Sequence, residues 1–395
     1  MNESGSTTRT DQPPLIRVAM LQPALPKYRN PVFRELSRRP GIDFQLFFSN
    51  DEPVKNVEPD GFRATPIATR LLTRRPRLLW RKAHLDLVDP KRFDVIVAGW
   101  NTRYVSLIPC LLKAARLNVP VVLWGHGYSK RETFLKRSFR DFVANLATAL
   151  IFYGHTGCKR FVARHGRPER AFVALNTLDQ SEIQAARKKV LEAPGFLEEF
   201  KRKNGLDKGP VLLFVSRLVQ DNRTDLLILA AKRLLPDFPD LRVVIVGGGE
   251  EEQHLRTVAK SAQVEQHTIF TGAIYEEAQL APWFLSASLF VYPSNMGLSL
   301  LHAMGYGLPV ITTDQSSTWA PELDGLKPWL NGMTFNHESV EDLAFVIRNM
   351  LQNPERLQRM RDSAYRTATR EYSLKRMVDG LEAAIRYAHS TTRKS

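Results

Sequence analysis

Cysteine is scarce in this chain of 395 residues, in which only Cys110 and Cys158 occur. Two thiols in a chain of this length build neither a disulfide framework nor a paired Cys/His zinc site, so we expect a reducing cytoplasm. Asp-x-Asp triplets and the phosphate-loop lysine motif are also missing. Carboxylate triplets of that kind hold divalent ions in many enzymes. The sequence therefore predicts no metal and no cofactor.

Long apolar runs are missing as well. No stretch of about 18 uncharged apolar residues occurs, so we expect no transmembrane helix. Met1–Pro14 is polar and has no apolar core of the kind found in secretory signals, and we predict a disordered tail over residues 1–14. The remaining length exceeds one ordinary domain and favours two.

Acidic residues are under-represented in the first half only. Residues 1–200 carry 33 Lys and Arg against 19 Asp and Glu, whereas residues 201–395 carry 23 against 22. This asymmetry predicts an anionic partner for the first half, such as a phospholipid surface, a lipid pyrophosphate or nucleic acid. An ordinary solvated basic surface would give the same counts. Because no recognised nucleic-acid motif accompanies the charge, we expect no nucleic-acid partner.

Two segments mix basic residues with large apolar ones, namely Arg70–Lys82 and Lys130–Phe142. The mixture is typical of segments that lie in a membrane interface. A helix that packs on the core and turns a charged face outward has the same composition. The first interpretation predicts that the protein is cytoplasmic and peripheral on the inner face of an anionic membrane.

Short apolar runs alternate with helical patterns along the chain, which predicts parallel sheets covered by helices. The pattern is interrupted near Leu178 and then restarts. We therefore predict an α/β protein of two doubly wound, Rossmann-like domains that face a central cleft. Their predicted bounds are 15–190 and 209–370, with a linker over 191–208 and a C-terminal helix over 371–395 that crosses back to the first domain. The predicted strands are Ile16–Leu21, Phe44–Phe48, Val95–Ala98, Val121–Trp124, Ala149–Tyr153, Phe172–Leu175, Pro210–Val215, Leu241–Val246, Thr268–Thr271, Leu289–Tyr292 and Val310–Thr313.

The most informative segment runs from Val291 to Ile311. A predicted strand ends at Tyr292, and Pro-Ser-Asn then predicts a turn and a helix cap. Gly297 allows a close approach of the backbone to a ligand, and Gly307 would end the helix. A helix start that opens on a cleft suits a diphosphate. An ordinary strand–turn–helix without a ligand follows the same pattern.

This segment resembles the donor-binding motif of the family-4 retaining glycosyltransferases, which have the GT-B fold. The two glutamates of the family motif are replaced here by Ser294, where the first contacts the transferred sugar, and His302, where the second contacts the ribose. A branch of polysaccharide-building relatives shares the Gly-Leu-Ser and the histidine, so His302 is expected to bind a ribose hydroxyl. The motif residues that the chain keeps are Gly297, Leu298, Ala303, Met304, Gly307, Pro309, Val310 and Ile311.

A second match lies at Phe214–Leu218, where the family has an arginine, followed five residues later by a lysine, that together hold the diphosphate. Arg217 matches the arginine, Asn222 stands at the lysine position, and the adjacent Arg223 is a candidate substitute for it. A guanidinium can bind two phosphate oxygens and offset charge on the leaving diphosphate. The resemblance thus implies a donor site made of Arg217, Asn222, Arg223, Gly247, Gly272, Ala273, Ile274, Ser294, Asn295, Met296, Gly297, Leu298, Ser299 and His302.

In the first half, Trp124–Tyr128 follows a predicted strand and places His126 between two glycines. Family members often have a histidine here near the sugar and the acceptor, so Arg217 and His126 are the predicted catalytic residues. A structural turn with a solvated histidine is the alternative. Loops that follow strands often carry function, which favours the first interpretation.

The resemblance implies transfer of a sugar from a nucleotide sugar to a glycan or lipid-linked acceptor, with retained configuration and without a metal. The first domain would bind the acceptor and the second the donor. Two other interpretations stay open. A catalytically silent sugar-nucleotide-binding partner fits the loss of glutamate at Ser294, and a nucleotide-sugar epimerase would need its own acid/base pair.

Overall fold

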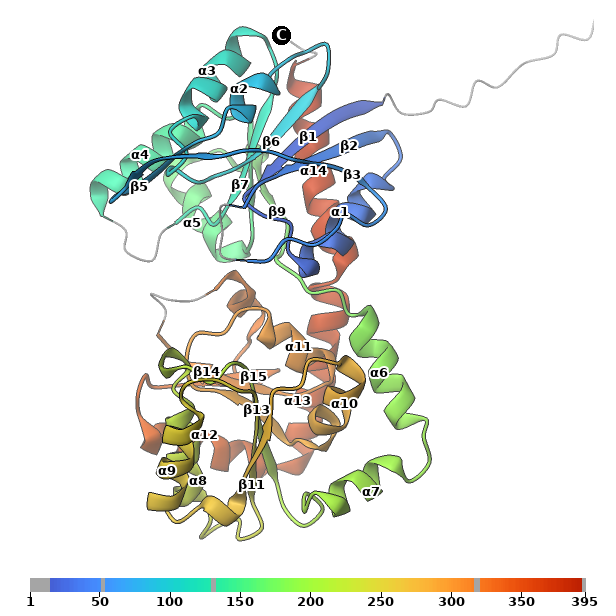
Figure 1. Cartoon of the computed structure of the whole chain (residues 1–395), viewed down its shortest axis with the longest axis vertical. Helices are drawn as coiled ribbons and strands as arrows, with labels where there is room; N and C mark the ends of the chain where they lie inside the picture. The colour runs from blue at the N-terminus through green and yellow to red at the C-terminus, as the bar shows by residue number, and fades with distance from the viewer. Residues whose placement is uncertain (1–14, 51–53, 129–132, 316–319, 393–395) are drawn as a thin grey trace, which may run out of the picture. The chain divides into compact units, whose positions relative to one another are not determined.

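The eleven apolar runs that the sequence marks as strands all form strands of two parallel sheets in the computed structural model of the chain (Figure 1). The structure describes residues 15–50, 54–128, 133–315 and 320–392. The predicted tail, together with Lys130 and Arg131, lies outside these ranges. The chain divides into two compact units. Unit 1 is made of residues up to Tyr153, Gly157–Ala174 and Met377 onward, and unit 2 of Gly154–Thr156 and Leu175–Arg376.

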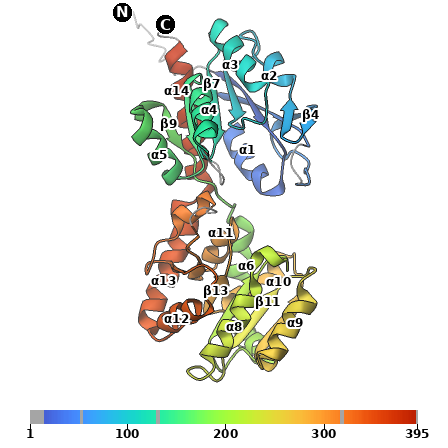
Figure 2. The same ribbon diagram turned by 90° about the vertical axis from the view of Figure 1, so that its left-hand side faces the viewer.

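Unit 1 is built on a parallel sheet that has seven strands in the described residues, in the order β3-β2-β1-β6-β7-β8-β9. The strand order reverses between β1 and β6, which is the point where ligands of open α/β sheets bind. The strands are β1 (Ile16–Gln22), β2 (Ile42–Phe48), β3 (Arg63–Pro66), β6 (Val95–Gly99), β7 (Val121–Gly125), β8 (Ala149–Phe152) and β9 (Ala171–Val173). The helices around this sheet are α1 (Asn30–Ser37), α2 (Ala83–Asp86), α3 (Leu107–Arg116), α4 (Phe134–Asn145), most of α5 (His155–His165) and most of α14 (Leu374–Thr392) (Figure 2).

Unit 2 is built on a second parallel sheet, in which the described strands have the order β12-β11-β10-β13-β14-β15. Here the order reverses between β10 and β13. The strands are β10 (Val211–Val215), β11 (Arg242–Val246), β12 (Thr268–Gly272), β13 (Leu289–Tyr292), β14 (Val310–Thr313) and β15 (Gly332–Phe335). The helices are α6 (Ser181–Leu191), α7 (Phe196–Lys203), α8 (Thr224–Leu234), α9 (Glu252–Ser261), α10 (Glu277–Ser286), α11 (Ser299–Gly305), α12 (Val340–Leu351) and α13 (Pro354–Arg366).

The division between the units falls at Ala174 and Leu175, earlier than the sequence pattern places it. The difference arises because α6 and the residue before it hydrogen-bond to α11 of unit 2. Gln180 donates from Nε2 to the Leu301 carbonyl at 3.2 Å, and Gln184 donates to the Gly305 carbonyl at 3.0 Å. The segment expected to be a linker, 191–208, contains α7. Helical periodicity alone does not say which sheet a helix covers.

The last helix, α14, belongs to unit 1 from Met377 onward. Gly380 lies so close to β9 that a Cβ there would stand 2.1 Å from the Val173 carbonyl oxygen. An ion pair joins Arg39 Nη1 to Asp379 Oδ1 at 3.0 Å. The C-terminal segment therefore completes the packing of the first unit.

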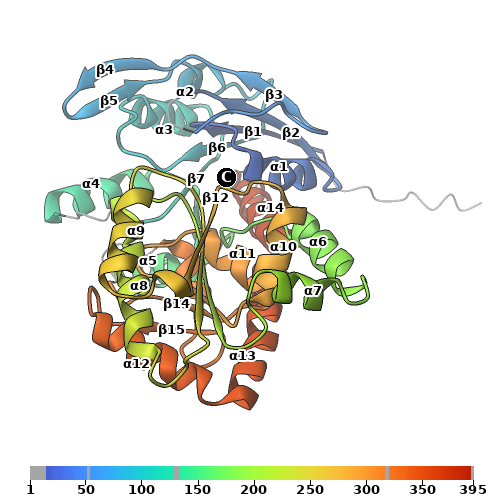
Figure 3. The same cartoon turned by 60° about the horizontal axis from the view of Figure 1, so that its bottom comes forward.

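Residues 70–80 form a β-hairpin, so the alternative of a core-packed helix does not hold for Arg70–Lys82. Strands β4 (Arg70–Arg74) and β5 (Arg77–Trp80) pair antiparallel, with Arg70 opposite Trp80 (Figure 3). Pro76 sits in the turn, where it removes the N–H that a helix would need. The second basic segment does form a helix, α4, from Phe134 onward, and Thr133 caps it by accepting from the Lys136 amide.

Candidate functional site

The loop after β10 presents Arg217 at the carboxyl edge of the unit 2 sheet. Its backbone is fixed on both sides: the Ser216 amide donates to the Val246 carbonyl at 3.1 Å, and the Leu218 amide donates to the Gly248 carbonyl at 3.0 Å. The Arg217 side chain is exposed and has no hydrogen-bond or ion-pair partner in the described part of the chain. A fixed backbone with an uncommitted guanidinium suits the binding of an anion.

The glycine turn after β11 supports that loop by shape. A Cβ at Gly247 would lie 1.9 Å from the Ser216 carbonyl oxygen, and one at Gly249 would lie 2.2 Å from the Leu218 carbonyl oxygen. No other residue type fits these two approaches without moving the backbone. The turn therefore holds the Arg217 loop in place, which agrees with a shape role and does not require a ligand contact.

Asn222, at the position of the family lysine, joins the same network. The Tyr292 hydroxyl donates to Asn222 Oδ1 at 2.8 Å, and Asn222 Nδ2 donates to the Arg217 carbonyl at 2.6 Å. Burial raises the pKa of the Tyr292 hydroxyl, so it remains a proton donor. Asn222 thus links the ends of β10 and β13 and contributes position instead of charge.

Arg223 is already paired with two carboxylates. Its Nε and Nη2 atoms each lie 3.1 Å from a different oxygen of Asp225, and Nη1 lies 2.5 Å from Glu338 Oε1. Hydrogen bonding to Asp225 raises the pKa of the guanidinium. To replace the family lysine, Arg223 would have to leave both partners. The geometry therefore favours Arg217 as the phosphate ligand.

The segment after β13 has a different helix start from the one predicted, and one of its predicted donor residues is buried. Helix α11 begins at Ser299, and no side chain caps it, so the predicted Pro-Ser-Asn cap is wrong. Thr312 instead uses the turn by donating from its hydroxyl to the Ser294 carbonyl at 2.7 Å. Met296 is 1% exposed and packs in the core, so only its main chain can meet a ligand. A Cβ added to Gly297 would have no neighbouring atom within 4 Å, so this residue borders open space.

His302 is held by a carboxylate that the sequence did not indicate. Its Nε2 atom lies 2.9 Å from Glu277 Oε1, and the buried Tyr306 hydroxyl donates to the same oxygen. Burial and the bond to Glu277 raise the pKa of Tyr306. Glu277 is the first residue of α10, just after the loop that holds Gly272, Ala273 and Ile274. No local pattern points to Glu277, because it lies 25 and 29 residues from the two side chains that it contacts.

The loop after β12 lies beside the glycine turn. The Gly247 amide donates to the Gly272 carbonyl at 2.9 Å, and Gly272 has φ +75° with open space around it. Ala273 is exposed and Ile274 is partly exposed. The loops that follow β10, β11 and β12 therefore gather the predicted donor residues Arg217, Gly247 and Gly272 along one edge of the sheet.

In unit 1 a cavity of about 640 Å³ opens where the strand order reverses. Its walls come from the segments that follow β1, β6, β7 and β8, including His126. A Cβ at Gly125 would lie 2.8 Å from Trp100 Cβ, and one at Gly127 would lie 2.5 Å from the Phe152 ring. These two glycines let the turn press against the core while the exposed His126 ring lies on the cavity side.

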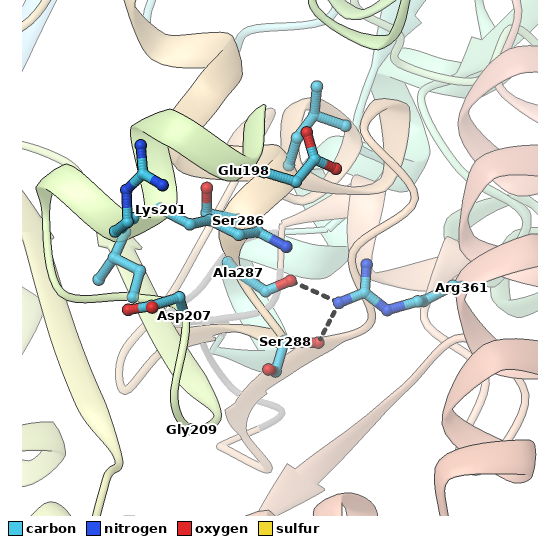
Figure 4. Close-up of a pocket in the computed structure, with 11 residues that line it drawn as sticks. Glu198, Lys201, Asp207, Gly209, Ser286, Ala287, Ser288 and Arg361 are labelled. Carbon is cyan, nitrogen blue, oxygen red and sulfur yellow. Dashed lines mark hydrogen bonds between the residues drawn. The ribbon is translucent and has the colours of Figure 1, made fainter. Parts of the chain in front are cut away.

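A second cavity of about 650 Å³ in unit 2 lies at the opposite edge of the sheet, because Gly209 and Ser288 precede β10 and β13. Figure 4 shows Arg361 pointing at this edge, where it donates to the carbonyls of Ala287 and Ser288. None of the predicted donor residues lines this cavity. Since ligands of doubly wound sheets bind beyond the carboxyl ends, we place the candidate site at the other edge.

Comparison with known proteins agrees with this geometry. Residues 197–367 match the family model described as glycosyl transferases group 1. This range contains Arg217, the glycine turn and the motif around Gly297. The similarity to the group 1 glycosyl transferases therefore covers the sheet of unit 2.

Curated relatives are similar to this chain over varying shares of its length. A GDP-mannose-dependent alpha-(1-6)-phosphatidylinositol monomannoside mannosyltransferase of Mycolicibacterium smegmatis is 27% identical over 316 residues, which cover 78% of this chain and 79% of the relative. An uncharacterized glycosyltransferase of Haemophilus influenzae is 26% identical, and the match spans half of that protein.

Solved structures show that the chain has the GT-B fold. The Anabaena protein HepE in complex with UDP superposes with a TM-score of 0.68 at 15% identity, over 93% of this chain and 98% of that one. The apo form of the lipopolysaccharide outer core galactosyltransferase WaaB gives a TM-score of 0.67 at 15% identity, over 94% and 99%. The fold predicted from the sequence is therefore confirmed.

Proposed function

We propose that this protein is a glycosyltransferase that moves a sugar from a nucleotide sugar, bound at the carboxyl edge of the unit 2 sheet, to an acceptor bound by unit 1. The observation that carries the proposal is Arg217, which is exposed and has no partner among the described residues. It lies on a loop clamped by two glycines, within the segment that matches the group 1 glycosyl transferases. Arg217 would bind the diphosphate and offset its charge as the bond to the sugar breaks.

The other donor residues take roles that follow from their positions. The main chain of Gly272–Ile274 would contact the base, the segment Ser294–Ser299 would face the sugar and phosphates, and His302 would bind the ribose through its second ring nitrogen. Retention of configuration and independence from a metal belong to the same proposal. His126 of the unit 1 cavity would assist at the acceptor.

Peripheral binding to an anionic membrane is part of this proposal. Helix α4 carries Phe134 and Leu135, which are 70% and 78% exposed, next to Lys136 and Arg137. Exposed apolar side chains among basic ones match what an anionic bilayer surface attracts. In the described ranges, no helix is long and apolar enough to cross a membrane.

A nucleotide screen tests the donor site. The purified protein is melted with UDP, GDP, ADP, CMP or dTDP, and we expect one of them to raise the melting temperature. A ligand at about 100 times its Kd stabilises the folded state by about 2.7 kcal/mol. The variant Arg217→Ala should lose this shift, whereas Lys260→Ala, an exposed lysine on α9, should keep it.

Turnover separates the proposal from a silent sugar-nucleotide-binding partner. The nucleotide sugar that carries the base found in the screen is incubated with the protein, and release of the nucleoside diphosphate is measured. Release that depends on Arg217 supports an enzyme. Binding without any release, with or without a glycan acceptor, would refute the transferase assignment.

A further inference from the structure

The cavity at the amino edge of the unit 2 sheet is separate from the candidate donor site. Its volume is about 650 Å³, which is typical of sites for small molecules. Helix α7, the loop before β10, the end of α10 and helix α13 supply its walls. A molecule bound in this cavity would therefore be a second ligand of unit 2, in addition to the nucleotide sugar.

Arg361 is a partly buried cation in the wall of this cavity. Loss of contact with water lowers the pKa of its guanidinium, which nevertheless stays charged. Its Nη2 atom donates to the carbonyls of Ala287 and Ser288, and no carboxylate pairs with it in the part of the chain that is described. Buried charges are normally paired, so a cation with carbonyl partners alone favours an anion in the adjacent space.

Lys201 supplies a second cation to the same cavity. Figure 4 shows its side chain extending from α7 toward the side on which Arg361 lies. The Lys201 ammonium has no hydrogen-bond or ion-pair partner among the described residues. Its neighbour Arg202 is also unpaired, although Glu198 stands four residues before it, a spacing at which ion pairs form on helices. Lys201 can therefore turn to a ligand without breaking an existing bond.

Two carboxylates, Glu198 and Asp207, line the cavity as well. Both side chains are exposed, and within the described ranges neither has a partner. Water and salt screen exposed charges, whereas the charge of the partly buried Arg361 is screened less. Carboxylate oxygens also accept hydrogen bonds from hydroxyl groups. The wall therefore combines a part that attracts an anion with groups that suit the hydroxyls of the same ligand.

The bonds that Arg361 already makes discriminate between kinds of anion. A planar carboxylate is bound best by two nitrogens on one edge of a guanidinium. Nη2 belongs to both edges that could do this, and it is already bonded to two carbonyls. Arg361 can therefore offer single bonds from Nη1 or Nε. The oxygens of a tetrahedral phosphate point in several directions, so a phosphate can accept such a bond and one from Lys201 at the same time.

We propose that this cavity binds a small molecule that carries a phosphate group, with Arg361 and Lys201 on the phosphate. The inference goes beyond the proposed function, because it concerns neither the donor site nor the cavity of unit 1. The phosphate can be inorganic or can belong to a small ester, whose hydroxyls would face Glu198 and Asp207. The experiment separates these two sources.

Binding is measured by calorimetry on the full chain that carries Arg217→Ala, so that the donor site does not contribute. The probes are inorganic phosphate and glycerol 3-phosphate, with acetate as the planar anion and glycerol as the neutral control. We expect at least one of the two phosphates to bind about tenfold more tightly than acetate or glycerol. Tighter binding of glycerol 3-phosphate identifies an ester as the ligand, and equal binding shows that inorganic phosphate is sufficient.

The variant Lys201→Gln should weaken phosphate binding by about tenfold, because hydrogen bonds to charged groups are stronger than those between neutral groups. Lys203→Gln is the matched control, since Lys203 is an exposed lysine of α7 that does not line the cavity. Lys201→Arg keeps the charge and should bind as the parent does. The Lys201 ammonium has no partner to lose, so all three variants should melt at the temperature of the parent when no ligand is present.

The proposal is overturned if neither phosphate binds or if acetate binds as tightly as they do. It is also overturned if Lys201→Gln binds as Lys203→Gln does, because the bound phosphate would then lie elsewhere on the chain. Nucleotide binding by the chain with Arg217 intact is a separate measurement, so the outcome at this cavity and the outcome for the proposed function can be told apart.

Discussion

The two units share a sheet topology but balance their charges differently. Unit 1 carries 33 Lys and Arg against 16 Asp and Glu, and unit 2 carries 23 against 25. In unit 2 two side chains near the site are paired with carboxylates, Arg223 with Asp225 and Glu338, and His302 with Glu277. In unit 1 the described wall of the cavity has no carboxylate. The excess positive charge therefore belongs to unit 1, whereas the site residues of unit 2 are held by shape and by fixed partners.

The largest effect should come from the shape of unit 2. Gly247→Ala would place a Cβ 1.9 Å from the Ser216 carbonyl, so the backbone must move. We expect unit 2 to lose about 3 kcal/mol or more in a urea unfolding experiment, together with nucleotide binding. Gly297→Ala, which faces open space, should stay within about 1 kcal/mol of the parent. Equal stability of the two variants would contradict the buttress role of the glycine turn.

The positive charge of unit 1 and its exposed apolar residues should control membrane binding. Phe134→Ser with Leu135→Ser removes apolar surface from α4, and each side chain contributes about 1.5 kcal/mol or more when buried in lipid. We expect a tenfold or larger loss of co-flotation with vesicles that contain anionic lipid at low salt. Phe345→Ser, which removes a 57% exposed side chain from unit 2, is the control and should bind as the parent does. Failure of the parent to float would remove the membrane from the proposal.

The partner of His302 can be tested next. Glu277→Ala leaves the ring and the Tyr306 hydroxyl without their shared acceptor, and we expect nucleotide affinity to fall about tenfold. Affinity for inorganic pyrophosphate should not change, because the loss concerns the ribose. The exposed neighbour variant Glu276→Ala should resemble the parent. A parallel loss for pyrophosphate would show that Glu277 supports the whole unit instead.

The smallest effect concerns an ion pair of unit 1. The Arg17 guanidinium donates two hydrogen bonds to Asp94, of 2.7 and 3.0 Å, and these bonds lower the pKa of that carboxyl. Because the pKa is lower in the folded state, the ionised carboxyl stabilises the protein at pH values above the unfolded pKa of about 3.9. This stabilisation is lost as the pH falls through the folded pKa. Asp94→Asn should therefore cost about 1 kcal/mol at pH 7. In urea unfolding across pH, the difference from the parent should persist down to about pH 4 and shrink below it, and a difference that does not change with pH would exclude the ion pair as its cause.

Local patterns were enough to locate most of the fold. Strands such as Val121–Trp124 and Leu289–Tyr292 are continuous apolar runs, because both faces of a parallel sheet are covered. The segment 70–80 was harder, since alternating basic and apolar residues fit a helix surface as well as a hairpin. Its conformation depends on pairing between β4 and β5 that the composition does not reveal.

The candidate site likewise combines residues that sequence motifs indicate with partners that no motif indicates. Arg217, Gly247 and the residues around Gly297 could be proposed from motifs, and their roles in donor binding stay predictions. The pairing of Arg223 with Glu338 joins residues 115 positions apart, and that of His302 with Glu277 joins residues 25 apart. Such partners are set by which strands and helices become neighbours, so no short window of sequence contains them.

The sequence by itself therefore determined the α/β alternation, the glycine-dependent turns and the unequal charge of the two halves, because these depend on residue type and spacing. The tertiary structure decided that α6 belongs to unit 2 and α14 to unit 1, and that Arg223 is neutralised while Arg217 is not. It also brought five of the Lys and Arg residues of unit 1 to the wall of one cavity. The physical reason is that packing and electrostatic partners act across space, between residues that the chain order keeps far apart.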